Sequence, residues 1–514
     1  MKHLIISFVI LVTCSKINAQ QYYSKMFDVY GNWESFSETF GSKKDTTFLV
    51  GFNANFFVTD STRFQSVFIT TLIQDSILVN KILVAKDSFN VTGLMIDKNG
   101  KSKKFINSML DLREKTYLQV TYFLNELSTN NDSIVSKKQL SLSNNFYSKY
   151  WIKVDNSFYC FGQIGNYDLT STTGFYKFDS NGEKSKYHPL NGSGKIINNV
   201  VETKDGNFLI AGLKYFGISG NDSAFAWYAK VDTLGNILWE QVLNRGSELM
   251  CSYVYVTNAN GNIYLTGSNI ANYPFYWYKG IYGDTSFSYM LKINENNGKI
   301  EWQRRFLCTI NSVRGLNDNL GAMTYYNGSL YTLIDHKNSE RLIPNDLSRY
   351  VMFAKFDLQG NLIWKRLFSN WYLSNRAYSL TPSEDGFLIC GDSKDSTHTK
   401  GDSDAWLIKT DSNGCIIPGC NAKDGIVQII NPEKVFTVFP NPAQNEINVS
   451  SINLSQKIEN LAVYNMQGQL LKSINTKVSS QQTINIEDLV NGNYLLIITT
   501  DKQQMAGKKF VVER

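Results

Sequence analysis

Phe387-Leu388-Ile389-Cys390-Gly391 is followed by Ala405-Trp406-Leu407-Ile408-Lys409-Thr410-Asp411 and then by Gly414, and this order of residues decides the fold. The first run is apolar and ends in Gly, which predicts a strand that meets a bend. The second run alternates sides, places its Lys outward and predicts a second strand. Asp411 and Gly414 predict a tight turn, because an Asp side chain bonds its own backbone and Gly accepts a positive φ. The stretch therefore predicts hairpins in series, with almost no room for helices.

The same unit recurs along the chain. About seven copies follow one another at spacings of about 40 to 70 residues, which is typical of a propeller or another repeat array. In the best copies a Trp stands four residues after the turn Gly, as Trp239 does after Gly235. The copies begin near Phe48, Phe89, Phe158, Asn207, Asn262, Ser329 and Gly386, and the first three are the weaker ones.

This repeat predicts an all-β fold, with a β-propeller of about seven blades over residues 20–420. One sheet cannot bury its own faces, whereas blades stacked around an axis bury them against each other. Six or eight blades stay open, because the first two copies are degenerate. A β-solenoid is the alternative, for which the spacings are too long and too irregular. Lys25 to Tyr30 resembles the strand after the Trp turn, which the last copy lacks, so we expect an N-terminal strand to complete the last blade.

The N-terminus predicts a secretory signal over residues 1–19. Lys2 supplies a positive start, and Leu4 to Val12 form an apolar run too short to span a bilayer. Small residues before Gln20 suggest a cleavage site. A lipoprotein signal that ends at Cys14 is the alternative. No later segment is apolar for long enough to cross a membrane.

Composition narrows the possible partners. The chain has 514 residues and a formal charge of +6, of which the signal carries two lysines and no acids. The remaining charge of about +4 is scattered and too weak to indicate nucleic acid. Aromatic residues make up 13% of the chain, which favours strands over helices. We expect an exported monomer that binds no nucleic acid.

Six cysteines remain after the signal: Cys160, Cys251, Cys308, Cys390, Cys415 and Cys420. An exported protein meets an oxidising compartment, in which disulfides persist. Cys415 and Cys420 flank a short loop, and for this pair a disulfide and two free thiols are both open. The other four lie in apolar, strand-like runs and are expected to behave as small buried hydrophobes. None has the spacing of a metal ligand.

The sequence contains no catalytic signature. The mature chain has three histidines, His188, His336 and His398, each in a polar segment that predicts a solvated loop. A hydrolytic triad, a nucleophile elbow, a zinc motif and a phosphate loop are all without a match. We therefore expect no catalytic, cofactor-binding or metal residue. The acidic loop from Asp392 to Asp404 offers oxygens for Ca²⁺ but lacks the EF-hand order, so a solvated hairpin loop is favoured.

Two aromatic segments are candidates for ligand binding. They contain Tyr273, Phe275, Tyr276 and Trp277 in one insertion, and Trp371 in another connection. Exposed aromatic side chains stack on sugar rings or anchor a protein partner. The alternative is a loop that packs its own aromatics against the propeller.

The tail has a distinct pattern. Residues 421–434 read as a linker, and residues 435–514 contain six or seven short alternating runs, which predict a small Ig-like β-sandwich. Its motif residues are Pro440, Asn441, Pro442, Gly468, Gly492, Tyr494, Lys509, Phe510 and Val511. This pattern resembles the type A C-terminal sorting domain of proteins exported by the type IX secretion system of Bacteroidota. The repeats resemble the propeller-like repeats of large exported Bacteroidota proteins.

The resemblance implies a destination rather than an activity. It implies Sec export to the periplasm, recognition of the tail by the outer-membrane type IX translocon, and removal by a cell-surface sortase. The protein is then released or held at the cell surface. We expect a non-catalytic module that binds a glycan or a protein. The alternative is a secreted hydrolase or lyase with a site at the propeller axis.

Overall fold

The computed structural model describes most of the strands and short turns of the chain. The described residues are 23–27, 33–43, 46–55, 64–73, 76–84, 88–96, 103–111, 119–127, 134–143, 146–155, 157–164, 172–216, 223–243, 249–271, 285–306, 319–337, 349–368, 375–383, 386–393, 404–416, 426–429, 435–452, 456–466, 469–501 and 504–514. All regular structure within these ranges is β-strand, which confirms the predicted all-β class.

Seven antiparallel units of four strands fill the chain up to Asp411, and we number them in chain order. Unit one contains β2 (Trp33–Lys43), β3 (Thr46–Asn55), β4 (Phe64–Ile73) and β5 (Ser76–Val84). Unit two contains β6 (Ser88–Ile96), β7 (Lys103–Asp111), β8 (Gln119–Leu127) and β9 (Ile134–Leu140). Unit three contains β10 (Phe146–Val154), β11 (Ser157–Ile164), β12 (Thr172–Phe178) and β13 (Lys184–Ser193). Units four and five are β14 (Lys195–Glu202), β15 (Phe208–Phe216), β16 (Ser223–Val231), β17 (Ile237–Val242); and β18 (Leu249–Ala259), β19 (Asn262–Ala271), β20 (Thr285–Ile293), β21 (Ile300–Phe306). Unit six is β22 (Asn319–Tyr326), β23 (Ser329–Lys337), β24 (Arg349–Phe356) and β25 (Leu362–Phe368), and unit seven is β26 (Asn375–Ser383), β27 (Gly386–Ser393), β28 (Asp404–Asp411) and β1 (Tyr23–Phe27).

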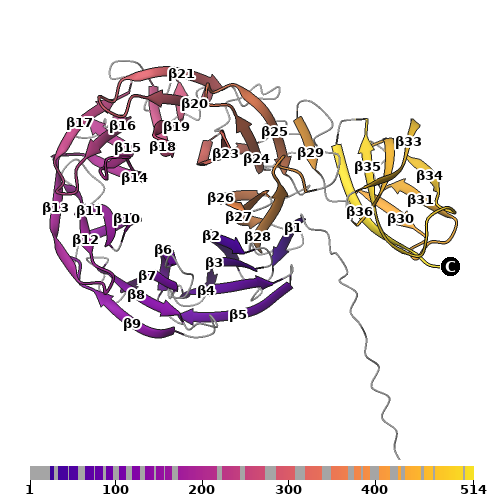
Figure 1. Ribbon diagram of the computed structural model, residues 1–514, viewed down its shortest axis with the longest axis horizontal. Coiled ribbons are helices and arrows are strands. Elements are labelled where there is room, and N and C mark those ends of the chain that lie inside the picture. The colour runs from indigo at the N-terminus through magenta and orange to yellow at the C-terminus, as the bar shows by residue number, and fades with distance from the viewer. Residues whose placement is uncertain are drawn as a thin grey trace, which may run out of the picture.

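The units follow one another around a ring, with the first strand of each nearest the centre (Figure 1). Neighbouring units contact each other through these inner strands, and β2 of unit one contacts β26 and β27 of unit seven. β1 pairs with β28 in antiparallel register, with Met26 opposite Trp406. This confirms that an N-terminal strand completes the last repeat.

One predicted copy is out of phase with the others. The run that ends in the repeat Gly is the second strand in units one, three, four, five and seven. The run at Phe89 to Gly93 instead lies in β6, the first strand of unit two. The second strand of unit two carries Asn107, opposite Val91, where these five units carry Gly. The sequence signal in this copy therefore came from the neighbouring strand.

The core lies between successive units. Phe175 of unit three packs with Phe208 of unit four, their ring centroids 6.0 Å apart, and Trp227 belongs to the same buried cluster. Large aromatic and β-branched side chains fill these gaps because each sheet must bury both faces against its neighbours. The ring therefore depends on unit-to-unit packing rather than on one central core.

The predicted turns are present and hold the units together. Oδ1 of Asp357 accepts hydrogen bonds from the backbone N–H groups of Gln359 and Asn361, at 2.9 and 2.8 Å. Gly360 in this turn has a φ of +76°, and the ring of Trp302 from the preceding unit lies over it. Trp239 covers Gly298 and Trp364 covers Gly414 in the same way. The repeat Trp and the turn Gly are thus two halves of one contact between units.

The C-terminal part contains seven strands after residue 434, in agreement with the predicted number. They are β30 (Phe436–Phe439), β31 (Glu446–Ser451), β32 (Ile458–Asn465), β33 (Leu470–Ser479), β34 (Gln481–Asn485), β35 (Gly492–Thr500) and β36 (Gln504–Val512). β30, β31 and β34 form one sheet, and β36, β35, β32 and β33 form a second. The two sheets share a buried cluster that includes Ile447, Leu496 and Phe510.

The two parts of the chain are joined by a strand. Within residues 421–434, β29 (Ile426–Ile429) pairs in parallel with β25 of unit six and with β36 of the C-terminal part. One buried cluster contains Phe353 and Trp406 of the ring together with Leu495 and Ile497 of the C-terminal sheets. The expected linker thus includes a strand that extends unit six into the C-terminal part.

Candidate functional site

The two ends of the ring differ in the length of their connections. Strands one and two of each unit, and strands three and four of units one to six, are joined by short turns at one end, which we call the tight-turn end. Since antiparallel strands alternate in direction, strands two and three are joined at the opposite end. These second connections include residues 217–222, 272–284, 338–348 and 394–403. We call this the long-connection end.

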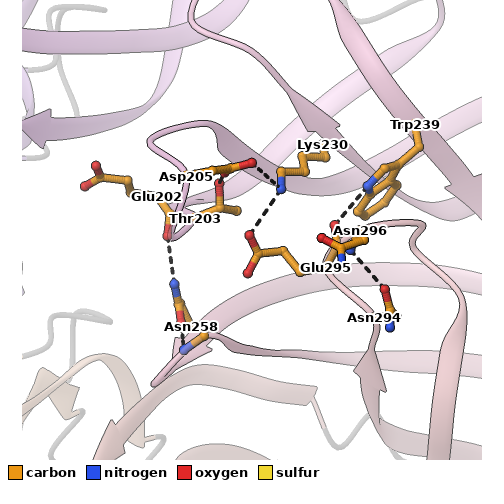
Figure 2. Close-up of polar contacts among 10 residues, drawn as sticks. Glu202, Thr203, Asp205, Lys230, Trp239, Asn258, Asn294, Glu295 and Asn296 are labelled. Carbon is orange, nitrogen blue, oxygen red and sulfur yellow. Dashed lines mark hydrogen bonds and ion pairs between the residues drawn. The ribbon is translucent and has the colours of Figure 1, made fainter.

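A buried cation lies at the tight-turn end between units four and five. Lys230 is only 4% exposed, and its Nζ lies 2.8 Å from Oδ2 of Asp205 and 3.1 Å from Oε1 of Glu295 (Figure 2). Trp239 donates its indole N–H to the backbone oxygen of Glu295 at 3.0 Å. Asp205 belongs to unit four and Glu295 to unit five, so this cluster links two neighbouring units.

The charges of this cluster satisfy each other. Burial acts to lower the pKa of Lys230, but its hydrogen bonds to Asp205 and Glu295 outweigh burial and raise it. Burial likewise acts to raise the pKa of Asp205, yet the bonds from Lys230 and Thr203 hold it well below its usual range. Because Lys230 bridges acids of two neighbouring units, the cluster is a structural clasp. The expectation that the repeat Lys points outward is wrong at Lys230, because two acids from adjacent turns draw it inward.

His188 also departs from its prediction. It lies in β13, is 6% exposed and stacks on Phe175 with ring centroids 5.0 Å apart. Its Nδ1 is 2.9 Å from the backbone oxygen of Leu234, in the turn of unit four that contains Gly235. It therefore occupies the position that Trp holds in later units, and it is not a solvated loop residue. His336 lies in β23, and His398 lies outside the described residues.

The long-connection end carries a feature that the sequence analysis missed. The first strand of every unit has a β-bulge at the same place, with one extra residue among its third to fifth positions. In unit three the extra residue is Lys149, in unit four Asn198 and in unit seven Tyr378. Bulges of this kind re-aim a side chain and recur next to binding sites.

The repeat Gly marks these bulges. Gly162, Gly212 and Gly391 lie opposite the bulge, and a Cβ on them would stand 2.1, 1.8 and 1.8 Å from a backbone oxygen of the first strand. Real atoms do not approach so closely, so only Gly fits at these three positions. In these units the Gly that ends the apolar run was thus the sequence signal for the bulge. It predicts a close backbone approach rather than a bend alone.

The bulge carries side chains into solvent. Lys149 is the only exposed residue of β10, and Tyr378 is the only exposed residue of β26, with 43% of its surface accessible. Asn198 is half-buried, and its Nδ2 has no hydrogen-bond partner among the described residues. These strands are the innermost of their units (Figure 1).

Tyr378 is held by a buried carboxylate. Its hydroxyl donates to Oδ1 of Asp392, which is 4% exposed, and Arg376 stands opposite Asp392 in the register of β26 and β27. Burial raises the pKa of Tyr378, and the neighbouring Asp392 charge raises it further. The phenol therefore stays protonated and offers its exposed ring. Asp392, the first residue of the acidic loop, thus accepts a hydrogen bond within unit seven, while residues 394–403 of that loop lie outside the described residues.

A second buried lysine lies at the same end. Lys195 is 1% exposed, its Nζ is 2.8 Å from Oε2 of Glu240, and it stands 5.1 Å from the centre of the Trp227 ring. Burial lowers the pKa of Lys195 in spite of its bond to Glu240. Trp227 donates to the same carboxylate oxygen at 3.0 Å. Lys195 Nζ also donates to the backbone oxygen of Asn191 in β13, so the buried charge links units three and four.

Several predicted site residues cannot be placed. Tyr273, Phe275, Tyr276, Trp277 and Trp371 lie outside the described residues, as do residues 394–403 of the acidic loop. Within the described ranges, no three His, Cys, Asp or Glu side chains are grouped to hold a metal ion. The same ranges contain no helix long and apolar enough to cross a membrane.

The structure gives the state of three of the cysteines. Cys160 and Cys390 are free and fully buried, which confirms the expectation for these two. Cys415 is disulfide-bonded, and its partner lies outside the described residues. Pairing with Cys420 stays a prediction, which the mass of the tryptic peptide 410–423, containing both cysteines, before and after reduction would test.

The motif residues of the tail come together around β36. Oδ1 of Asn441 accepts a hydrogen bond from the Val511 N–H at 2.9 Å, between Pro440 and Pro442, whose preceding peptide bonds are both cis. In this register Gly492, where β35 begins, pairs with Val512 next to Val511, and Lys509 pairs with Leu495. The Pro440-Asn441-Pro442 segment, near the start of the tail, is thereby hydrogen-bonded to β36, its last strand. Gly468 lies outside the described residues.

Tyr494 completes this corner, and Arg514 adds to it. Tyr494 is 5% exposed, stacks on Phe510 at 5.6 Å and donates its hydroxyl to the Val490 oxygen at 2.7 Å. The side chain of Arg514 donates to the backbone oxygens of Leu489 and Ile486, at 2.6 and 2.8 Å. Arg514 was not predicted, and a lone terminal Arg carries no local signal.

Comparison with known protein families identifies the domain formed by the tail. Residues 437–513 match the family described as "Secretion system C-terminal sorting domain". The search of curated proteins found no significant match. Among solved structures, an ulvan lyase, a polysaccharide lyase, aligns at 10% identity and a TM-score of 0.46, over 75% of this chain and 96% of its own. Kuenenia stuttgartiensis hydrazine synthase aligns at 12% identity and a TM-score of 0.44, over 75% of this chain and 97% of its own.

These structural likenesses are too distant to carry an argument about activity. The family match is of a different kind, since it covers nearly the whole C-terminal pair of sheets. The chain thus carries a secretion-system C-terminal sorting domain at residues 437–513, which supports a cargo protein of the type IX secretion system.

Proposed function

We propose that this protein is an exported, non-catalytic binding module of Bacteroidota whose ring is a seven-bladed β-propeller over residues 20–420. In this proposal β1 completes the seventh blade, residues 1–19 are a removed signal, and residues 435–514 form a β-sandwich that the type IX translocon recognises. A cell-surface sortase then acts on the region between 421 and 434. The mature propeller, a monomer, works at the cell surface or outside the cell.

One observation carries the binding role: the two ends of the ring are built differently. The tight-turn end is closed by short turns, Trp–Gly contacts and paired charges such as Lys230 with Asp205 and Glu295. The long-connection end gathers the longer segments and the bulged inner strands. Surface connections on a rigid scaffold are where binding residues concentrate. The aromatic segment 273–278 belongs to one of these connections, so we assign the glycan or protein ligand to this end.

Export is tested by truncation. Removal of residues 435–514 should leave the protein in the periplasm, whereas the full chain reaches the surface or the medium. Fractionation and immunoblotting of the two strains measure this. Normal surface delivery of the truncated chain would contradict the proposed sorting role.

Binding is tested with the exported chain from Gln20 onward, on a glycan array and against outer-membrane and host surface proteins. Trp277→Ala should reduce binding at least fivefold if the aromatic segment contacts the ligand. Leu234→Ala is the matched control, because Leu234 is 66% exposed in a turn at the opposite end. Equal binding by both variants would remove the aromatic segment from the proposal.

The alternative is a hydrolase or lyase that acts at the axis. Its support is the Tyr378–Asp392 pair, a hydroxyl held by a buried carboxylate and carried by β26, the innermost strand of unit seven. A screen of the same chain against polysaccharide substrates decides between the two. Substrate turnover that is lost in Tyr378→Phe would favour the enzyme.

A further inference from the structure

The second sheet of the C-terminal part is buried on both of its faces. Successive side chains of a strand point to opposite faces of its sheet. In β35, Leu496 belongs to the cluster that the two C-terminal sheets share. Leu495 and Ile497 instead belong to the cluster that contains Phe353 of unit six and Ile416, which follows unit seven. The sorting domain is therefore docked on the ring through an apolar face that would otherwise meet water.

The strand β29 completes this dock. It lies between β25 of the ring and β36 of the sorting domain (Figure 1). Ile429 has a partner on each side, Phe368 in β25 and Met505 in β36. β29 lies within residues 421–434, where the proposed function has the sortase act. Cleavage of a paired strand depends on how often that strand opens, so the dock shields this segment.

The dock also buries a charge that is exposed in the neighbouring unit. Arg304 in unit five and Arg366 in unit six each follow the repeat Trp by two residues, and each guanidinium lies over that Trp ring. Arg304 is exposed, whereas Arg366, opposite Val427 of β29, is 2% exposed. The Nε of Arg366 has no hydrogen-bond partner among the described residues. A buried donor without a partner costs free energy, so the docked state is closed but can still be opened.

We propose that this dock is a closed state of the protein and that capture of the sorting domain by the type IX translocon opens it. In the closed state β29 is paired on both sides, and the sortase finds no free strand. Capture draws the apolar face of the sorting domain away from the ring and frees β29 for cleavage. Recognition of the tail therefore precedes its removal. This inference rests on the proposed function and adds the order of its two steps.

The test measures the opening of β29 in the full exported chain from Gln20 onward. Hydrogen exchange of the β29 amides follows the opening directly, and thermolysin, which cuts before large apolar residues, follows it by cleavage within β29. Ile497→Gln weakens the docked face and should raise both rates about tenfold or more. Val478→Gln is the matched control, because Val478 is 49% exposed in the same domain, and it should leave both rates unchanged. Continued exchange protection of β31, in the other sheet, shows that the sorting domain of each variant is folded.

A second pair of variants changes the dock from the side of the ring. Arg366→Met removes the buried donor without a partner and should slow the exchange of β29 about threefold. Arg304→Met makes the same change at the exposed position of unit five and should have no effect. In cells, Arg366→Met should keep its tail longer than Arg304→Met, which an immunoblot shows as a higher ratio of uncleaved to cleaved chain.

The outcomes separate this inference from the proposed function. Unprotected β29 amides in the wild-type chain, or equal rates in Ile497→Gln and Val478→Gln, would overturn the dock and leave the sorting role standing. Equal ratios of uncleaved to cleaved chain in the two arginine variants would overturn the order of capture and removal. Normal surface delivery of the chain without residues 435–514 would overturn the sorting role, and the order with it, whereas the exchange result would still establish the dock.

Discussion

Gly360 gives the sharpest test of how neighbouring units are held together. It has a φ of +76°, and a Cβ added to it would lie 2.7 Å from the ring of Trp302 in the preceding unit. Gly328 is the matched control, since its φ is +78° and nothing lies within 4 Å of its added Cβ. Alanine at either position incurs the same backbone cost, but only Gly360→Ala collides with a neighbouring unit.

The expected magnitudes follow from these two terms. A left-handed Ala costs about 1 to 2 kcal/mol, so Gly328→Ala should lose that amount. Overpacking against the Trp302 ring adds about 1 to 3 kcal/mol, which gives Gly360→Ala a loss of about 2 to 5 kcal/mol. Urea unfolding of the exported chain, followed by Trp fluorescence, measures both. Combining Trp302→Leu with Gly360→Ala should cost less than the sum of the single changes.

Equal losses for Gly360→Ala and Gly328→Ala would refute the reasoning. That result would mean that the Trp–Gly contact adjusts without cost and that the units are held mainly by the buried clusters between them. Additive losses in the Trp302→Leu double variant would lead to the same conclusion. A loss confined to Gly360→Ala and relieved by Trp302→Leu would instead establish the contact as a fastener between units.

Three further predictions follow from single contacts. Lys230→Met should destabilise the chain by about 3 kcal/mol, because Asp205 and Glu295 lose their shared cation; a loss below about 0.5 kcal/mol would contradict the clasp. Because the pKa of Asp205 is depressed in the folded state, its contribution to the free energy of unfolding is present above about pH 4 and is lost as the pH falls through the folded pKa. Because the pKa of Lys230 is raised, its contribution is lost only above about pH 10. The unfolding curves of the wild type and Lys230→Met should therefore converge in acid. Arg514→Ala should destabilise the sorting domain by about 1 to 3 kcal/mol, since the backbone oxygens of Gln444, Leu489 and Ile486 lose a charged donor; proteolysis of the tail at the wild-type rate would argue against this role.

The sequence predicted the elements that depend on local chemistry. The Asp-x-x-Gly turn forms as predicted at Asp357 to Gly360, because side-chain and backbone bonds within a few residues determine it. The Pro440-Asn441-Pro442 segment and Tyr494 were recognised for the same reason, since a sorting tail is a compact motif. Missed features depend on partners far away in the chain. Lys230 appeared to be an outward residue, and His188 appeared to lie in a loop, until adjacent units supplied their partners.

What the sequence alone determined is the repeat, the β class, the closing N-terminal strand and the sorting tail. Each follows from hydrophobic alternation and turn residues, which act over a few positions and recur with the period of the unit. Only the tertiary structure decided that the repeat Gly lies opposite a bulge, and that the extra residues Lys149 and Tyr378 are the exposed ones of their strands. The physical reason is that register between strands and packing between units are set by contacts across space, which no single stretch of the chain contains.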